Sequence, residues 1–217
     1  MSTRPDLSVG VISDTHLPYR MAHLPAIIFD IFQGVDLILH AGDVDEIDLL
    51  TPLEKIAPLY AVRGNIHLTD FSSGGRNLPP QVELTLTKYK VVLTHGHRPG
   101  LMGWLMKIPE FFLTDVFWSK GRTLNDEIAN RLSNQYPQAD IIIFGHTHIP
   151  YCRPIGKTLC FNPGSVASEK NRLTSVGLLH LWPHQIEAQI VPLNQPKNQA
   201  HYLKKLGFTS FNYLFSQ

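Results

Sequence analysis

The first third of the chain alternates short, largely apolar runs with stretches in which apolar residues recur at helical spacing. The apolar runs predict buried strands at 7–13, 35–39 and 59–62. Between them, the helical spacing predicts a helix over 23–33 and a second over about 45–57. Strands that alternate with helices in this way are typical of an α/β fold with neighbouring parallel strands.

The pattern changes after residue 80, where strand-like runs follow one another closely. Residues 82–87 alternate apolar and polar positions and 89–94 follow at once, which predicts a hairpin. Further strands are predicted at 140–144, 149–153, 158–161, 175–182 and 185–191. We therefore expect a single domain in which two sheets pack face to face with helices outside. No internal repeat and no linker-like stretch marks a domain boundary.

Two segments exceed this minimal core: an apolar insert over about 98–123 and an aromatic extension from about residue 192. The insert fits an extra helix or two packed on the core, a lid or self-association face, or a membrane-surface patch for a lipid-linked substrate. Its charged residues Lys107, Glu110 and Asp115 argue against a spanning segment. The tail raises the same alternatives, including a surface that covers a neighbouring subunit in a homo-oligomer.

Composition narrows the class of protein. The chain has 217 residues, 43% of them apolar and 17% charged, which suits one globular domain and excludes a disordered chain. The formal net charge of +1 gives no strong nucleic-acid signal. No apolar leader and no run of 18 apolar residues is present, so we expect a cytoplasmic protein. In that compartment Cys152 and Cys160, which flank a predicted turn, are expected to stay reduced.

Five short motifs rich in carboxylate, amide and imidazole groups follow predicted strands in the first 148 residues. In order they are Asp14-Thr15-His16, Gly42-Asp43, Gly64-Asn65, His95-Gly96-His97 and Gly145-His146-Thr147-His148. Each motif alone is weak, because Asp and Asn are ordinary turn residues at strand ends. Together they supply enough ligands for two metal ions, since the ends of parallel strands converge at one edge of a sheet.

The donor types favour a dinuclear centre for a phosphate ester. Asp14 and His16 are expected to share one side of an extended segment, because alternate residues share a face, and His146 and His148 have the same spacing. Asp43 stands alone after its strand and suits a bridging carboxylate between ions about 3.5–4 Å apart. Such mixed ligands accept Mn, Fe, Zn, Ni or Co, with Mn our first choice.

The order and spacing of these motifs resemble those of the calcineurin-like metallophosphoesterase superfamily, over residues 7 to about 191. The length resembles its small single-domain phosphodiesterase branch, which includes a metal-poor scaffold subunit of the retromer sorting complex. The resemblance implies a four-layer αββα sandwich of two mixed sheets. It also implies that the first ion is held by Asp14, His16, Asp43 and His148, and the second by Asp43, Asn65, His95 and His146.

The resemblance further implies a hydrolase in which a hydroxide that bridges the two metals attacks phosphorus in line. The leading hypothesis is a phosphodiesterase that acts on a small-molecule phosphoester. A phosphomonoesterase and a pyrophosphatase for a nucleotide or lipid diphosphate remain open. A non-catalytic scaffold is the alternative of another class, although every expected ligand is present in the sequence.

The third motif departs from the family pattern. Many relatives carry a histidine after the Gly-Asn pair, which is thought to protonate the leaving group, but Ile66 stands at this position here. His67 and His97 are the candidates for the general acid. Arg63, Asn65 and Asn162 are candidates to contact the substrate, with a surface ion pair for Arg63 and a structural turn for Asn162 as equal alternatives. His40 is read as a partner of the metal ligands or as a packed core histidine.

Overall fold

The computed structural model describes residues 4–17, 20–45, 47–64, 78–97, 117–167, 173–194 and 212–216. Asn65, Ile66 and His67 lie outside the described residues, and so do most of the insert and most of the tail. The statements below concern the described part of the chain.

The described strands form two mixed sheets. One has six strands in the order β11-β10-β9-β1-β2-β3. These strands are β1 (Leu7–Ile12), β2 (Leu37–His40), β3 (Leu59–Ala61), β9 (Ser175–Leu181), β10 (Gln185–Pro192) and β11 (Asn212–Ser216). β1, β2 and β3 run parallel, and β9 joins β1 in antiparallel register.

The second sheet has five described strands in the order β4-β5-β6-β8-β7. They are β4 (Gln81–Leu86), β5 (Tyr89–Thr94), β6 (Ile141–Ile143), β7 (Tyr151–Ile155) and β8 (Thr158–Asn162). β5, β6 and β8 are parallel, while the hairpins β4–β5 and β7–β8 are antiparallel.

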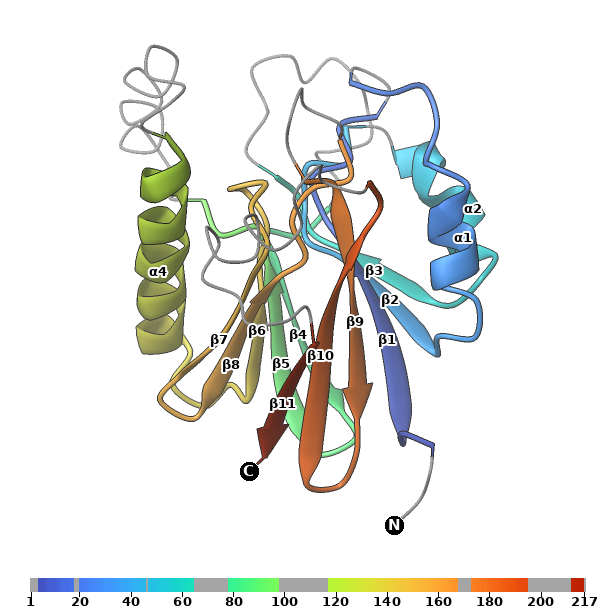
Figure 1. Cartoon of the computed structure of the whole chain (residues 1–217). Helices are drawn as coiled ribbons and strands as arrows, with labels where there is room; N and C mark the ends of the chain where they lie inside the picture. Colours follow the sequence, from blue (N-terminus) through green and yellow to red (C-terminus); the bar gives the residue numbers. More distant parts are fainter. Residues whose placement is uncertain are drawn as a thin grey trace.

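Helices cover the outer faces of the two sheets (Figure 1). α1 (Ile27–Ile31), the 3-10 turn η1 (Ile47–Leu50) and α2 (Thr51–Glu54) lie on the six-stranded sheet, and α4 (Phe117–Gln135) lies on the five-stranded sheet. Three separate apolar clusters fill the space under α1 and α2, between the sheets, and under α4. The four-layer αββα sandwich is therefore confirmed.

Alternation along the strands builds the central layer. In β10 the buried residues Ile186, Ala188 and Ile190 point between the sheets, and the intervening residues are partly exposed. Burying an isoleucine side chain in this layer stabilises the fold by about 1.5–3 kcal/mol. The hydrophobic pattern thus fixes the register of the strands, and the register fixes where each strand ends.

Several predicted elements differ in extent from the observed ones. The first helix begins only at Ile27, after Pro25, and the second is split into η1 and α2 near Pro52. Proline suits only the first helical turn, which is where Pro52 lies in α2, whereas Pro25 lies two residues before the start of α1. Helix α4 was not predicted as a 19-residue element.

The end of the tail packs on its own chain. β11 pairs with β10, and Tyr213 and Phe215 contact the apolar layer between the sheets, while Leu214 is exposed. These residues therefore extend a sheet of the same chain, and the alternative that the tail also covers a neighbouring subunit stays a prediction.

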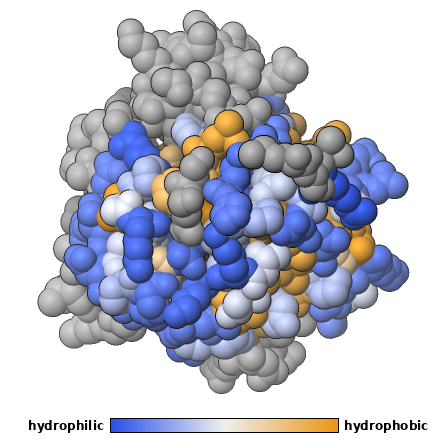
Figure 2. All heavy atoms as spheres, turned by 90° about the horizontal axis from the view of Figure 1, so that it is seen from below, coloured by the Kyte–Doolittle hydropathy of each residue, from blue (hydrophilic) through white to orange (hydrophobic). Residues whose placement is uncertain are grey.

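The opposite end of the sandwich from the metal motifs carries the tight turns. Figure 2 shows this end, where most described side chains are hydrophilic and apolar ones appear between them. The predicted turn at Gly156 lies here and joins β7 to β8, which place Cys152 and Cys160 as two free, buried thiols. No described helix is long and apolar enough to cross a membrane.

Candidate metal centre

The loops that carry four of the five motifs leave neighbouring strands at the same end of the sandwich. The loop after β1 meets the loop after β2 through a hydrogen bond from the Asp14 N–H to the Gly42 carbonyl, 3.0 Å. The loop after β6 meets the loop after β5 through the Gly145 N–H and the His95 carbonyl, 3.2 Å. These bonds join two motifs within each sheet, and the His146 N–H, which donates to Asp14 Oδ2 at 3.1 Å, joins the two sheets across the sandwich.

The backbone at these positions is left-handed. Asp14, His16, Asp43, His146 and His148 have φ values of 52°, 48°, 56°, 75° and 58°. The expectation that both pairs lie on extended segments is wrong, although Asp14 and His16 do reach the same point. Non-glycine residues in this region cost of order 1–3 kcal/mol each and persist where surrounding contacts hold them. Sharp turns, not strand pleating, aim these side chains.

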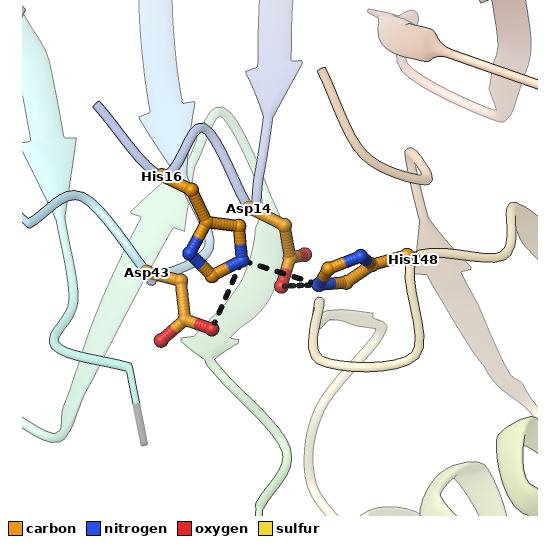
Figure 3. A group of neighbouring side chains, drawn as sticks. All are labelled: Asp14, His16, Asp43 and His148. Atoms are coloured by element: carbon orange, nitrogen blue, oxygen red, sulfur yellow. Dashed lines mark hydrogen bonds and ion pairs between the residues drawn. The ribbon is translucent and has the colours of Figure 1, made fainter. Parts of the chain in front are cut away.

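Four ligand-type side chains converge on one point (Figure 3). The ligand atoms of Asp14, His16, Asp43 and His148 all lie within 4.8 Å of one another. His148 Nε2 is 3.3 Å from Asp14 Oδ1 and 3.2 Å from His16 Nε2, and His16 Nε2 is 3.6 Å from Asp43 Oδ2. This set of two carboxylates and two imidazoles matches the ligands expected for the first ion.

A second group of histidines, His95, His97 and His146, lies next to Asp43. His95 Nε2 lies 3.4 Å from Asp43 Oδ2, and the His95 and His146 rings are 5.2 Å apart. The His97 ring is 5.6 Å from that of His95 and 6.5 Å from that of His146. Asn65, the remaining ligand expected for the second ion, lies outside the described residues.

A hydrogen bond at His95 and a carboxylate beside His16 orient these two imidazoles. His95 Nδ1 donates to the Ala41 carbonyl at 2.8 Å, which directs Nε2 of the same ring toward Asp43. His16 Nδ1 lies 3.7 Å from Asp45 Oδ2. A carboxylate or carbonyl behind a ligating imidazole fixes its tautomer and raises its basicity. The donor set therefore fits a divalent cation.

Asp14 is oriented by its neighbours in the same way. Its Oδ2 accepts the Ser13 hydroxyl at 2.6 Å and the His146 N–H at 3.1 Å, so Oδ1 faces His148. A Cβ on Gly145 would lie 2.0 Å from Ser13 Oγ. Glycine is therefore required beside Asp14 for steric reasons.

The charges of the site are strongly coupled. Burial disfavours both carboxylates, but the adjacent histidines outweigh it and hold the pKa values of Asp14 and Asp43 below their usual range. Burial also opposes a proton on His95, yet the Asp43 carboxylate raises its pKa to about 9. Burial and the charge on His95 lower the pKa of His146 to about 3. The carboxylates therefore stay ionised at neutral pH, and a cation that binds His95 Nε2 must displace the proton there.

His40 supports Asp43 from behind and belongs to the buried core. The Gly42 N–H donates to His40 Nδ1 at 3.2 Å, so the proton sits on Nε2, which faces Thr15 Oγ1 at 3.2 Å. The Thr15 hydroxyl lies 3.2 Å from the Asp43 carbonyl and donates to it. Burial lowers the pKa of His40 to about 4, so this chain of bonds runs through a neutral imidazole. His40 is therefore both a buried core residue and a hydrogen-bonding partner of the loop that carries Asp43.

Of the candidate substrate residues, Asn162 is buried and Arg63 is exposed. Asn162 is fully buried and uses both ends of its amide, donating to the Gly145 carbonyl at 2.9 Å and accepting from the Gly164 N–H at 2.9 Å. These are the bonds of a structural turn beneath the His146 loop. Arg63 is exposed at the end of β3, next to Gly64.

Comparison with known proteins identifies the family. A family model described as the calcineurin-like phosphoesterase superfamily domain matches residues 7–182. The chain belongs to this superfamily. The matched residues include both groups of side chains next to Asp43, namely Asp14, His16 and His148 on one side and His95 and His146 on the other.

Individual calcineurin-like proteins show the same relationship. The chain is 32% identical over 187 residues to a probable metallophosphoesterase of Methanocaldococcus jannaschii, covering 86% of this chain and 82% of that protein. A phosphodiesterase of the same organism is 22% identical, covering 80% of this chain and 92% of that protein. The structure of vacuolar protein sorting 29 from Cryptosporidium parvum has a TM-score of 0.65 at 20% identity, covering 98% and 100% of the two chains. The last match shows the shared calcineurin-like fold.

Several residues that shape this calcineurin-like site were not predicted from the sequence. They are Ser13, Thr15 and Asp45, which adjoin ligands, and Asn125 and Arg131 on α4, which contact the histidine loops. Asn125 carried a usable signal, because it is a polar residue in line with the apolar positions Ile128 and Leu132.

Proposed function

We propose that the chain is a metal-dependent phosphodiesterase with two divalent ions that share Asp43. The observation that carries the proposal is the position of Asp43 Oδ2, which lies 3.6 Å from His16 Nε2 and 3.4 Å from His95 Nε2. One carboxylate oxygen thus borders both histidine groups. In this proposal the first ion takes Asp14, His16, Asp43 and His148, and the second takes Asp43, Asn65, His95 and His146.

When bound, the pair of ions supplies a hydroxide at neutral pH and electrostatic stabilisation of the phosphoryl oxygens. The side chains of the protein hold the ligands in place for this chemistry. Asp14 and Asp43 bring negative charge into a buried site, and the inward Nε2 atoms of His16 and His95 complete the two groups. Mn is the ion we favour, and Fe, Zn, Ni and Co suit the same donors.

The proton for the leaving group has two candidate sources. His97 lies beside His95 and His146 at the edge of the site, which favours it as the general acid. His67 is the second candidate and lies outside the described residues, as does Ile66. Arg63 is exposed next to Gly64, where a guanidinium can contact a phosphate oxygen.

Diester specificity is supported by the similarity to the phosphodiesterase of M. jannaschii. A phosphomonoesterase or a diphosphate pyrophosphatase would use the same ligands, so substrates must separate them. A scaffold function is disfavoured because the described ligands converge with inward nitrogen and oxygen atoms. The cytoplasmic location, a homo-oligomer and membrane-surface contact through the insert stay predictions.

A substrate panel tests the proposal. Metal-free protein is reloaded with Mn²⁺ and given bis(4-nitrophenyl) phosphate, 4-nitrophenyl phosphate, a 2′,3′-cyclic nucleotide and a lipid diphosphate. Hydrolysis in ¹⁸O-labelled water should place the label on the phosphate product and none on the phenol. The diester should react with the highest kcat/KM. A faster monoester or diphosphate would replace the diesterase with one of the alternatives, and inactivity on all four would support a scaffold.

A further inference from the structure

One face of helix α4 reaches both histidine loops of the site. Asn125, Ile128 and Arg131 are three residues apart and therefore lie on the same side of the helix. Asn125 contacts the loop that carries His146 and His148, whereas Ile128 and Arg131 contact the loop that carries His95 and His97. The helix thus connects two loops that come from different strands.

Asn125 holds the first loop through two hydrogen bonds. Its Nδ2 donates to the Ile149 carbonyl at 3.1 Å, and its Oδ1 accepts the Thr147 hydroxyl at 2.8 Å. Asn125 is only 1% exposed, so both ends of its amide need partners inside the protein. An asparagine is unfavourable in the middle of a helix, and these bonds give the reason for its presence.

Thr147 is the centre of that loop. It lies between His146 and His148, and its hydroxyl also accepts from the Asn162 amide at 3.2 Å and from the Ile149 N–H at 3.3 Å. The histidines on either side have positive φ, which costs free energy that local contacts must offset. Asn125 therefore stabilises the one backbone form that sends His148 toward Asp14 and His146 toward His95.

The second loop is held at Gly96. The Arg131 guanidinium donates to the Gly96 carbonyl, between His95 and His97. A Cβ on Gly96 would lie 3.1 Å from Ile128 Cγ2, so the helix packs directly against this backbone. The same helical face therefore limits where His95 can lie relative to Asp43.

We propose that the Asn125–Ile128–Arg131 face of α4 is a positioning surface that sets the geometry of the metal-binding histidines. This inference rests on the proposed function, because it assumes that His95, His146 and His148 bind metal. The residues of this face act through the backbone and touch no ion. Groups that orient metal ligands typically change metal affinity or activity by about 10–100-fold when they are mutated.

The test measures Mn²⁺ affinity by titration calorimetry on EDTA-stripped, full-length protein, together with the unfolding temperature of the metal-free form. Asn125→Leu should bind Mn²⁺ at least about tenfold more weakly. Asn130→Leu makes the same change on an exposed position of α4, and Ala129→Gly weakens the helix by about 1 kcal/mol. Both control variants should bind Mn²⁺ within twofold of the wild type.

Thr147→Val and Thr147→Ser keep the inference testable if Asn125→Leu does not fold. Thr147→Val removes the hydroxyl and should weaken metal binding, while Thr147→Ser retains it and should restore binding. Wild-type affinity in Asn125→Leu and Thr147→Val, or equal losses in Ala129→Gly, would overturn the inference alone. A wild-type protein that binds Mn²⁺ but cleaves no phosphoester would overturn the proposed function alone. A wild type that binds no metal would overturn both.

Discussion

Nε2 of His95 lies 3.4 Å from Oδ2 of Asp43, and the Nδ1 of the same ring is fixed by the Ala41 carbonyl. The two residues come from different sheets, at the ends of β5 and β2. Their meeting joins the two halves of the sandwich at one carboxylate. Asp43 is therefore the residue on which both predicted metal groups depend.

Asp43→Asn should remove the shared negative charge while keeping the shape of the side chain. We expect the diesterase kcat/KM to fall at least about 100-fold, because metal ions contribute several kcal/mol to the transition state. Bound Mn²⁺ should fall below two ions per chain by elemental analysis. Asp126→Asn makes the same change at a carboxylate that pairs with Arg153 and Tyr151, and should keep full activity. Equal activity of the two variants would argue against a shared ligand at Asp43.

Gly64→Ala should disrupt the site by a steric clash with Asp43, without removing any ligand. A Cβ at this position would lie 1.6 Å from Asp43 Oδ1, so the carboxylate must move. We expect loss of metal binding at a modest loss of stability, measured by calorimetry and thermal unfolding. Gly156→Ala is the matched control, because its φ is +60° and its Cβ would meet nothing within 4 Å. It should cost about 1–2 kcal/mol of stability and leave metal affinity unchanged.

The sequence predicts the metal ligands better than it predicts the residues that orient them. Motif order predicted which side chains meet, because strand ends converge wherever the parallel strands run. It did not predict how they meet, since the left-handed turns at Asp14 and His148 depend on contacts from distant elements. A short motif carries no information about such partners.

Helix α4 shows the same limit in the fold. Leu124, Ile128 and Leu132 do have helical spacing, but Gly121 and Asn125 are weak helix formers and obscure it. Packing on the five-stranded sheet overrides these local preferences. Asn125, a polar residue among these apolar positions, was the sequence feature that indicated a contact between this helix and the site.

The buried His40 predicts a pH dependence of stability for metal-free protein. Its pKa falls from 6.5 in the unfolded chain to about 4 in the folded one, so between these values the unfolded state holds more protons. Stability should therefore be complete above pH 6.5 and decrease as pH falls toward 4, by about 3 kcal/mol at most from this residue. Urea unfolding at several pH values measures the slope.

His40→Asn removes this titration and retains an acceptor for the Gly42 N–H. The variant should have a shallower decline in stability between pH 6.5 and 4 than the wild type. An identical decline would show that other groups account for the acid sensitivity.

The identity of the leaving group should matter more than in relatives with a histidine after the Gly-Asn pair. Because Ile66 occupies that position, esters with acidic leaving groups should react much faster than alkyl esters. General-acid help is worth about 10²–10⁴-fold, so aryl and alkyl phosphodiesters should differ on that scale. Ile66→His should raise the rate for alkyl esters and change aryl esters little. Equal wild-type rates for both classes would refute the idea that the acid is weak.

The most direct measurement is the dependence of diester cleavage on metal occupancy. EDTA-stripped protein is titrated with Mn²⁺ while bound metal and the rate with bis(4-nitrophenyl) phosphate are recorded together. The shared position of Asp43 predicts no activity without metal and a rate that saturates at two ions per chain. Full activity in the stripped protein, or no activity with two ions bound, would contradict a dinuclear phosphodiesterase.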